Sequence, residues 1–225
     1  MNILSKKSLP LGGFAGLTEH RLVTDLRVFG SRKAPNTFDG IGNFVYLADA
    51  QFNPHGQTHM HSHKEIDVIS IMMNGRVSHE GSLEHGQSLN TGEAQVQRAG
   101  GEGFSHNEIN PDEQENHMIQ LWVLPDVAGQ PAGYKVYRPL VGQSQRIYGG
   151  NQGQDETFNS QTLIDVANLE AGQRLQHEGE LMLYLSDGAG QVNGQSIEAR
   201  TLVRFEQGMD FTADESAQLI LISQI

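Results

Sequence analysis

Three histidines and one glutamate occupy two short segments of this 225-residue chain at the spacing expected of metal ligands. His61 and His63 lie two residues apart in THMHSHKEID, and His106 and Glu108 lie two residues apart in GEGFSHNE. Because successive side chains of a β-strand point to opposite faces, each pair would share one face of a strand. Three imidazoles and one carboxylate favour iron, manganese, cobalt, nickel, copper or zinc over calcium or magnesium. The spacing therefore predicts a transition-metal site.

The neighbouring residues indicate that both pairs face the interior of a barrel. If one strand runs on past the first pair, its odd positions continue to Ile69, Ile71 and Met73, which are apolar. Phe104 shares the parity of the second pair. Polar groups buried in this way need partners, because each unsatisfied one costs on the order of 1–3 kcal/mol. A bound cation would supply them.

The elements that must position these ligands are short strands. Apolar or β-branched segments alternate with glycine turns such as Asn74-Gly75, Thr91-Gly92 and Gly100-Gly101, and no long helical period occurs. This pattern predicts an all-β protein of the jelly-roll barrel kind. The segment HMIQLWVLP reads as a buried strand whose Trp122 belongs to the core, with stacking on a substrate as the lesser alternative.

The pattern occurs twice, which predicts two tandem barrels. We expect a metal-binding domain at residues 1–130 and a second domain at residues 131–225, with a stretch rich in glycine, proline and glutamine at residues 125–153. The segment LYLSDGAGQVNG loosely repeats ISIMMNGRVSHEG of the first half. The second half has His177 alone where the first half has its histidine pairs, so we expect this domain to be structural and free of metal.

Composition and charge exclude several classes of protein. The formal net charge of −12 argues against direct binding to nucleic acid, which depends on basic residues that neutralise phosphates. The chain has no cysteine, which excludes disulfides and thiolate ligands and fits a reducing cytosol. The basic N-terminus lacks the apolar core of a signal peptide, and no stretch approaches the ~18 apolar residues of a membrane helix. We expect a cytoplasmic protein that does not enter membranes.

The first half resembles the pirin family of bicupins. The run His61-Ser-His63-Lys-Glu-Ile-Asp67, the turn at Gly75 and the segments RVSHEGSLEHG and TGEAQVQRAGGEGFSHNE carry the resemblance. In the family, a His-Pro-His opening leads to Glu-His-Arg-Asp-Ser-Leu, then Pro-Gly-Asp, then Ala-Gly-Arg-Gly-x-x-His-x-Glu. Matching by distance to Gly75 places the family's three histidines and its glutamate on His61, His63, His106 and Glu108. An alternative register with His59, His61 and Glu65 has the same parity, and only the distance to Gly75 argues against it.

The departures from the family pattern concern the pocket more than the ligands. Ser62 replaces the proline between the first two histidines, and Thr91-Gly92-Glu93 replaces Pro-Gly-Asp. Glu102, which we interpret as a turn residue, stands where the family usually has arginine. Asp67 either orients a ligand histidine through its free N–H or is held by a backbone turn.

The remaining histidines look less suited to chemistry. His55 lies in a turn-like Asn-Pro-His-Gly segment and is interpreted as a solvent residue. His79 matches the middle segment of the family pattern, but it lies with His85 on an expected hairpin. Both are interpreted as surface residues.

The resemblance implies a bicupin with one divalent transition-metal ion, Fe(II) before manganese, nickel, cobalt, copper or zinc. It implies a dioxygenase that cleaves flavonols such as quercetin, small aromatic substrates, with Glu108 as catalytic general base. It also implies a C-terminal cupin without metal. The alternatives are a non-catalytic, metal- or redox-responsive module that binds a protein partner, and a metal enzyme with another small substrate, such as an isomerase or a sugar- or acid-binding cupin. We expect a monomer.

Overall fold

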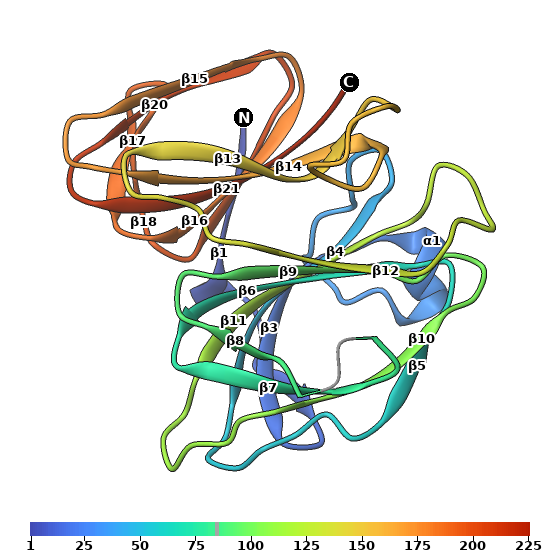
Figure 1. Ribbon diagram of the computed structural model, residues 1–225. Coiled ribbons are helices and arrows are strands. Elements are labelled where there is room, and N and C mark those ends of the chain that lie inside the picture. Colours follow the sequence, from blue (N-terminus) through green and yellow to red (C-terminus); the bar gives the residue numbers. More distant parts are fainter. Residues whose placement is uncertain (84–85) are drawn as a thin grey trace. The chain divides into compact units, whose positions relative to one another are not determined.

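The computed structural model describes residues 1–83 and 86–225, and strands make up nearly all of its regular structure (Figure 1). The predicted all-β class is therefore confirmed. The chain divides into two compact units, which we name the N-terminal barrel, Leu9–Arg138, and the C-terminal barrel, Met1–Ser8 with Pro139–Ile225. None of the short helices in the described part of the chain is long and apolar enough to cross a membrane.

The units differ from the expected division into residues 1–130 and 131–225, because strand pairing assigns two segments to the other unit than expected. Gly133–Tyr137 (β12) pairs with Ala94–Arg98 (β9) and so belongs to the N-terminal barrel. Asn2–Ser5 (β1) pairs with Thr201–Phe205 (β19) and joins the chain's first residues to the C-terminal barrel. Backbone hydrogen bonds between residues far apart in sequence thus set these boundaries.

Two antiparallel sheets form the N-terminal barrel. The larger sheet has the order β12-β9-β6-β11-β4-β3-β2 and the smaller has the order β5-β10-β7-β8. The remaining strands of the larger sheet are Gly12–Phe14 (β2), Leu17–Thr24 (β3), Phe44–Phe52 (β4), Asp67–Asn74 (β6) and His117–Val123 (β11). The smaller sheet consists of His61–His63 (β5), Arg76–Gly81 (β7), Ser88–Asn90 (β8) and Phe104–Ile109 (β10).

The predicted continuous strand from His61 to Met73 is wrong. The chain turns at residues 64–66, where Glu65 has a φ of 54°, and β5 and β6 belong to different sheets. The odd positions that place His61 and His63 on one face of β5 therefore do not define the same face on β6. On β6 it is Ser70, at an even position, whose hydroxyl reaches Glu108.

The interior of the N-terminal barrel is divided between apolar and polar regions. One apolar cluster gathers side chains of β3, β4, β6, β7, β8 and β11, namely Leu17, Ala50, Phe52, Met72, Val77, Leu89 and Met118. A second cluster joins Val68, Ala99 and Phe104, with Leu83 and Trp122 packed against it. Trp122 is only partly buried there. The prediction that Trp122 belongs to the core therefore holds only for the part of its side chain that packs against this cluster.

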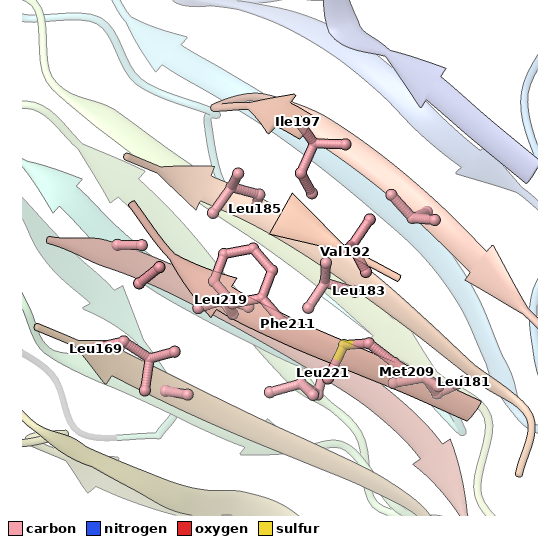
Figure 2. Close-up of a cluster of buried hydrophobic side chains, with 14 of the residues drawn as sticks. Leu169, Leu181, Leu183, Leu185, Val192, Ile197, Met209, Phe211, Leu219 and Leu221 are labelled. Atoms are coloured by element: carbon pink, nitrogen blue, oxygen red, sulfur yellow. The ribbon is translucent and has the colours of Figure 1, made fainter. Parts of the chain in front are cut away.

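The C-terminal barrel is also built from two antiparallel sheets, ordered β1-β19-β16-β21-β14-β13 and β15-β20-β17-β18. Its other strands are Gln143–Gly150 (β13), Ser160–Leu169 (β14), Arg174–Glu178 (β15), Leu181–Asp187 (β16), Ala189–Val192 (β17), Gln195–Glu198 (β18), Gly208–Ala213 (β20) and Ala217–Gln224 (β21). Leucine side chains from β16 and β21 pack around Phe211 in its core (Figure 2). His177 lies on β15, outside this cluster. That this barrel binds no metal stays a prediction.

A short helix, Leu26–Phe29 (α1), connects β3 to the 3₁₀ turn Gly30–Arg32 (η2), and Asp25 caps it. The Asp25 carboxylate accepts hydrogen bonds from the Arg27 backbone N–H at 2.9 Å, the Arg27 guanidinium at 2.8 Å and the Gly40 N–H at 3.0 Å. The side-chain bond from Arg27 is the main cause that lowers the pKa of Asp25 to about 2.

Replacing Asp25 with alanine should lower the free energy of unfolding by about 1–2 kcal/mol at neutral pH, because a helix cap is lost. The folded-state pKa lies below the unfolded one. The stabilisation is therefore present above the unfolded pKa and is lost as the pH falls through about 2. Urea unfolding of both proteins at decreasing pH measures this. If the difference in unfolding free energy between wild type and Asp25→Ala stayed constant down to pH 2, the lowered pKa of Asp25 would be contradicted.

Candidate metal centre

His61, His63 and His106 come together at the junction of β5 and β10. The two strands pair antiparallel with His106 opposite His61 and Phe104 opposite His63. One potential ligand atom from each of the three histidines lies within 4.8 Å of the others. The ring centroids are 4.5 Å apart for His61 and His106, 4.9 Å for His61 and His63, and 5.1 Å for His63 and His106. Among the described residues this is the one group of three or more side chains that could hold a metal ion.

The hydrogen bonding of these imidazoles fits a cation. His61 Nδ1 lies 2.8 Å from the His59 carbonyl oxygen and must carry the proton to donate to it, which leaves a lone pair on Nε2. His61 Nε2 and His106 Nε2 face each other at 3.0 Å. Burial is the main cause that lowers the pKa of His63 to about 4 and of His106 to about 2, and the neighbouring histidines lower both further. The neutral imidazole thus favoured is the form that binds a metal.

Glu108 lies in the same strand but belongs to a different set of contacts. Its carboxylate is not part of the three-histidine group. Oε1 accepts hydrogen bonds from Ser70 at 3.1 Å and Gln95 at 3.0 Å, and Oε2 accepts one from Gln120 at 3.2 Å. Burial raises the pKa of Glu108 to about 7, although these three hydrogen bonds oppose the rise. The structure thus places Glu108 on the same strand as His106, two residues further along, and its role as a fourth ligand stays a prediction.

The interpretation of His79 as a surface residue is wrong. Its side chain is 1% exposed, and its ring centroid lies 5.4 Å from that of His106. His79 Nε2 lies 2.8 Å from the side-chain nitrogen of Gln97, which is fully buried. The hairpin does form, but the pairing of β7 with β10 turns His79 into the barrel. His85 lies outside the described residues.

A polar network that the sequence analysis missed surrounds Glu108. Its fully buried members Ser70 and Gln95 lie on β6 and β9, and the Tyr134 hydroxyl donates to the Gln95 carbonyl oxygen at 3.1 Å. Gln97, also on β9 and fully buried, instead contacts His79. A signal for them existed: Gln95 and Gln97 share one strand face, and Ser70 interrupts an apolar run. Polar residues inside otherwise apolar strands often mark an internal network, because they must be hydrogen-bonded when buried.

Aromatic side chains form the other wall of the site. His63 contacts Phe104 and Trp122, with centroid distances of 5.2 Å and 5.9 Å. Trp122 in turn packs against Tyr46, with ring centroids 4.3 Å apart, and stacks on Phe29, with centroids 6.1 Å apart. The three histidines therefore stand between a polar network and an aromatic wall.

The other acidic candidates bind backbone groups. Asp67 Oδ1 accepts a hydrogen bond from the Ala99 N–H at 3.0 Å, which supports the backbone alternative for this residue. Glu65 accepts one from the Gly129 N–H at 2.9 Å, and Glu102 one from the Ala132 N–H at 3.3 Å. Glu102 also lines a pocket together with His63 and Phe104. Since neither His59 nor Glu65 belongs to the metal-binding group, the alternative register receives no support. His55 is largely exposed and pairs with Glu113.

Gly81 permits the close pairing of β7 with the ligand strand β10. It lies opposite His106, and a Cβ at this position would collide with the Ser105 carbonyl oxygen and lie 3.0 Å from the His106 Cα. Gly81→Ala should therefore cost roughly 1–3 kcal/mol of unfolding free energy and weaken metal binding as the strands separate. Urea unfolding and metal titration measure the two effects. Gly12→Ala is the control, because its Cβ would meet only the Glu19 carbonyl oxygen at 3.7 Å.

Comparison with known proteins agrees with this architecture. The pirin family model matches residues 26–123, which include all three histidines and Glu108. The structure of YhhW from Escherichia coli superposes with a TM-score of 0.85 at 18% identity, covering 100% of this chain and 97% of that one. Residues 26–123 therefore match the pirin family, and the chain as a whole has the fold of this bacterial pirin. Its two barrels accordingly have the tandem jelly-roll architecture of a bicupin.

Other pirin relatives carry names that concern metal and substrate. The structure of a bacterial pirin from Escherichia coli in complex with nickel(II) superposes with a TM-score of 0.83 at 19% identity, covering 98% of this chain and 97% of that one. A Pseudomonas aeruginosa protein, provisionally named a quercetin 2,3-dioxygenase, is 29% identical over 174 residues, which are 72% of this chain and 75% of that relative. The quercetin 2,3-dioxygenase of Escherichia coli K12 is 25% identical over 170 residues, 72% of this chain and 73% of its own.

Proposed function

We propose that this pirin-like protein is a metal-dependent dioxygenase that cleaves flavonols of the quercetin type in the cytoplasm. The observation that carries the proposal is the convergence of His61, His63 and His106 within 4.8 Å, next to an aromatic wall and with the buried Glu108 on the same strand as His106. The names of the Pseudomonas aeruginosa and Escherichia coli relatives support the substrate class. Fe(II) is the metal that we propose as native, with the nickel of the related bacterial pirin as the first alternative.

The three imidazoles would hold one metal ion, which supplies Lewis acidity and coordination positions for a substrate oxygen and dioxygen when bound. Their neutral state means that no proton must be displaced from His63 or His106 before the ion binds at neutral pH. The His59 carbonyl fixes the ring of His61, so its Nε2 already points toward His106. The site is thus arranged for the ion in advance.

Glu108 would accept the proton of the flavonol 3-hydroxyl. A carboxylate oxygen has two lone pairs, and Oε2 accepts a single hydrogen bond, from Gln120, among the described residues. A lone pair on Oε2 therefore remains for the proton. Ser70 and Gln95 hold Oε1 and so fix the direction in which Oε2 points. Trp122 and Phe104 would pack against the flat substrate rings.

The test is oxygen consumption with quercetin after metal removal and reconstitution with iron, manganese, nickel, cobalt or copper in turn. We expect turnover with at least one metal, stoichiometric metal content, and no reaction with a flavone that lacks the 3-hydroxyl. A protein that holds its metal yet consumes no oxygen with any of them would refute the dioxygenase and favour the alternative of a metal-responsive module that binds a protein partner.

A further inference from the structure

A line of aromatic side chains leads from the three-histidine site to a buried carboxylate. His63 and Trp122 have ring centroids 5.9 Å apart, and Trp122 and Tyr46 have centroids 4.3 Å apart. Trp122 and Tyr46 lie opposite each other on the paired strands β11 and β4. Indole and phenol are the side chains that lose an electron most readily, so rings in contact can pass an electron between them.

At the end of this line away from the histidines, Tyr46 has a carboxylate that can accept its proton. The Tyr46 hydroxyl, on a side chain only 3% exposed, donates to Glu19 Oε2 at 2.7 Å. Arg21 Nε donates to the other oxygen of Glu19 at 2.6 Å. Glu19 and Arg21 line a cavity of about 240 Å³ next to Pro10–Gly13, Ala34 and Thr37. A proton that leaves Tyr46 therefore has an acceptor, and that acceptor lies at a cavity.

We propose that Trp122 and Tyr46 form an electron-transfer route that carries oxidising equivalents away from the metal site and leaves a neutral tyrosyl radical at Tyr46. The proposal rests on the proposed metal site, but not on the flavonol reaction. Its function would be to move oxidation away from the ligand histidines when the site meets an oxidant without substrate.

The step balances with hydrogen peroxide as the named oxidant. One peroxide takes up two electrons and two protons from solvent and becomes two waters. A bound Fe(II) would supply one of these electrons and become Fe(III), and Tyr46 would supply the other by way of Trp122. The O–H bond of Tyr46 breaks, and its proton forms a new O–H bond on Glu19. The Trp122 Nε1 is buried without a hydrogen-bond partner among the described residues, so Trp122 passes the electron on without a proton acceptor of its own.

Tyr134 provides an internal comparison. Its ring centroid lies 6.1 Å from that of His79, which itself lies 5.4 Å from His106, so Tyr134 is also near the site. Its hydroxyl donates to the amide oxygen of Gln95, which is a far weaker base than a carboxylate. Proximity is thus similar for the two tyrosines, but the proton acceptor differs.

The experiment mixes iron-loaded protein with hydrogen peroxide in the absence of flavonol and records the electron paramagnetic resonance spectrum after rapid freezing. Iron content is measured on every sample. We expect a neutral tyrosyl signal in the wild type, its loss in Tyr46→Phe, a reduced yield in Trp122→Phe and Glu19→Gln, and an unchanged signal in Tyr134→Phe. Mass spectrometry of the wild type should find oxidation at Tyr46, which requires no variant to fold.

Two results would overturn the route. One is an iron-loaded wild type that forms no tyrosyl radical, and the other is a Tyr46→Phe protein that keeps the full signal. A wild-type protein that takes up no iron would also overturn the route, because the metal site on which it rests would then not exist. Because no flavonol is present, a protein without dioxygenase activity can still show the radical, so the two proposals fail separately.

Discussion

Changing His106 to alanine should leave the protein unable to hold a stoichiometric metal ion. His106 is fully buried, and its Nε2 faces that of His61 at 3.0 Å, so its loss removes one of three ligands and opens the site. The affinity should fall by more than the roughly 10–100-fold that loss of an outer hydrogen-bond partner costs. Elemental analysis and metal titration of the purified variant measure this.

The matched control is His177→Ala. This histidine lies on β15 of the C-terminal barrel and belongs to no group of potential ligands among the described residues. Its replacement should leave the metal content unchanged. Equal metal loss in both variants, or full metal retention in His106→Ala with the fold intact by circular dichroism, would remove the three-histidine site as the place where metal binds.

Replacing Glu108 with glutamine should abolish most of the turnover while the metal stays bound. Loss of a general base typically costs about 10²–10⁴-fold in rate. The amide fills the same volume and can still accept from Ser70 and Gln95, but it cannot take up a proton. Steady-state kcat with quercetin, together with metal content, separates this role from that of a ligand.

Glu80→Gln is the control for this variant. Glu80 lies on β7, opposite Asn107, whose amide it accepts at 3.4 Å, and alternation along the strand places it on the other face from His79. The kcat of Glu80→Gln should equal that of the wild type. If Glu108→Gln loses metal as His106→Ala does, Glu108 is a ligand and the proton must go elsewhere. If Glu108→Gln turns over at the wild-type rate, Glu108 has neither role.

The sequence alone was sufficient to find the three histidines and the all-β class. Both follow from local rules: two-residue spacing places ligands on one face of a strand, and glycine turns between short apolar runs indicate a β-protein. His61 and His63 share β5, and His106 lies on β10, as the spacing required. The three-histidine group was predictable because its parts are local and only one strand pairing joins them.

The contacts around the ligands depended on non-local pairing and could not be read from the sequence. The turn at residues 64–66 moved β6 into another sheet, so Ser70 and not Ile69 or Ile71 points at Glu108. A single residue of register reverses which face a side chain occupies, and only the assembled sheet fixes that register.

His79 and Tyr46 are two further residues whose surroundings could not be predicted from the sequence. His79 looked exposed because its hairpin is local, but pairing of β7 with β10 buries it beside His106. Tyr46 gave no chemical signal, since its partners Glu19 and Trp122 come from strands distant in sequence. The sequence thus determined which histidines form the candidate metal site. The tertiary structure decided which side chains hold, surround and connect these histidines, because those contacts are made only when the sheets close.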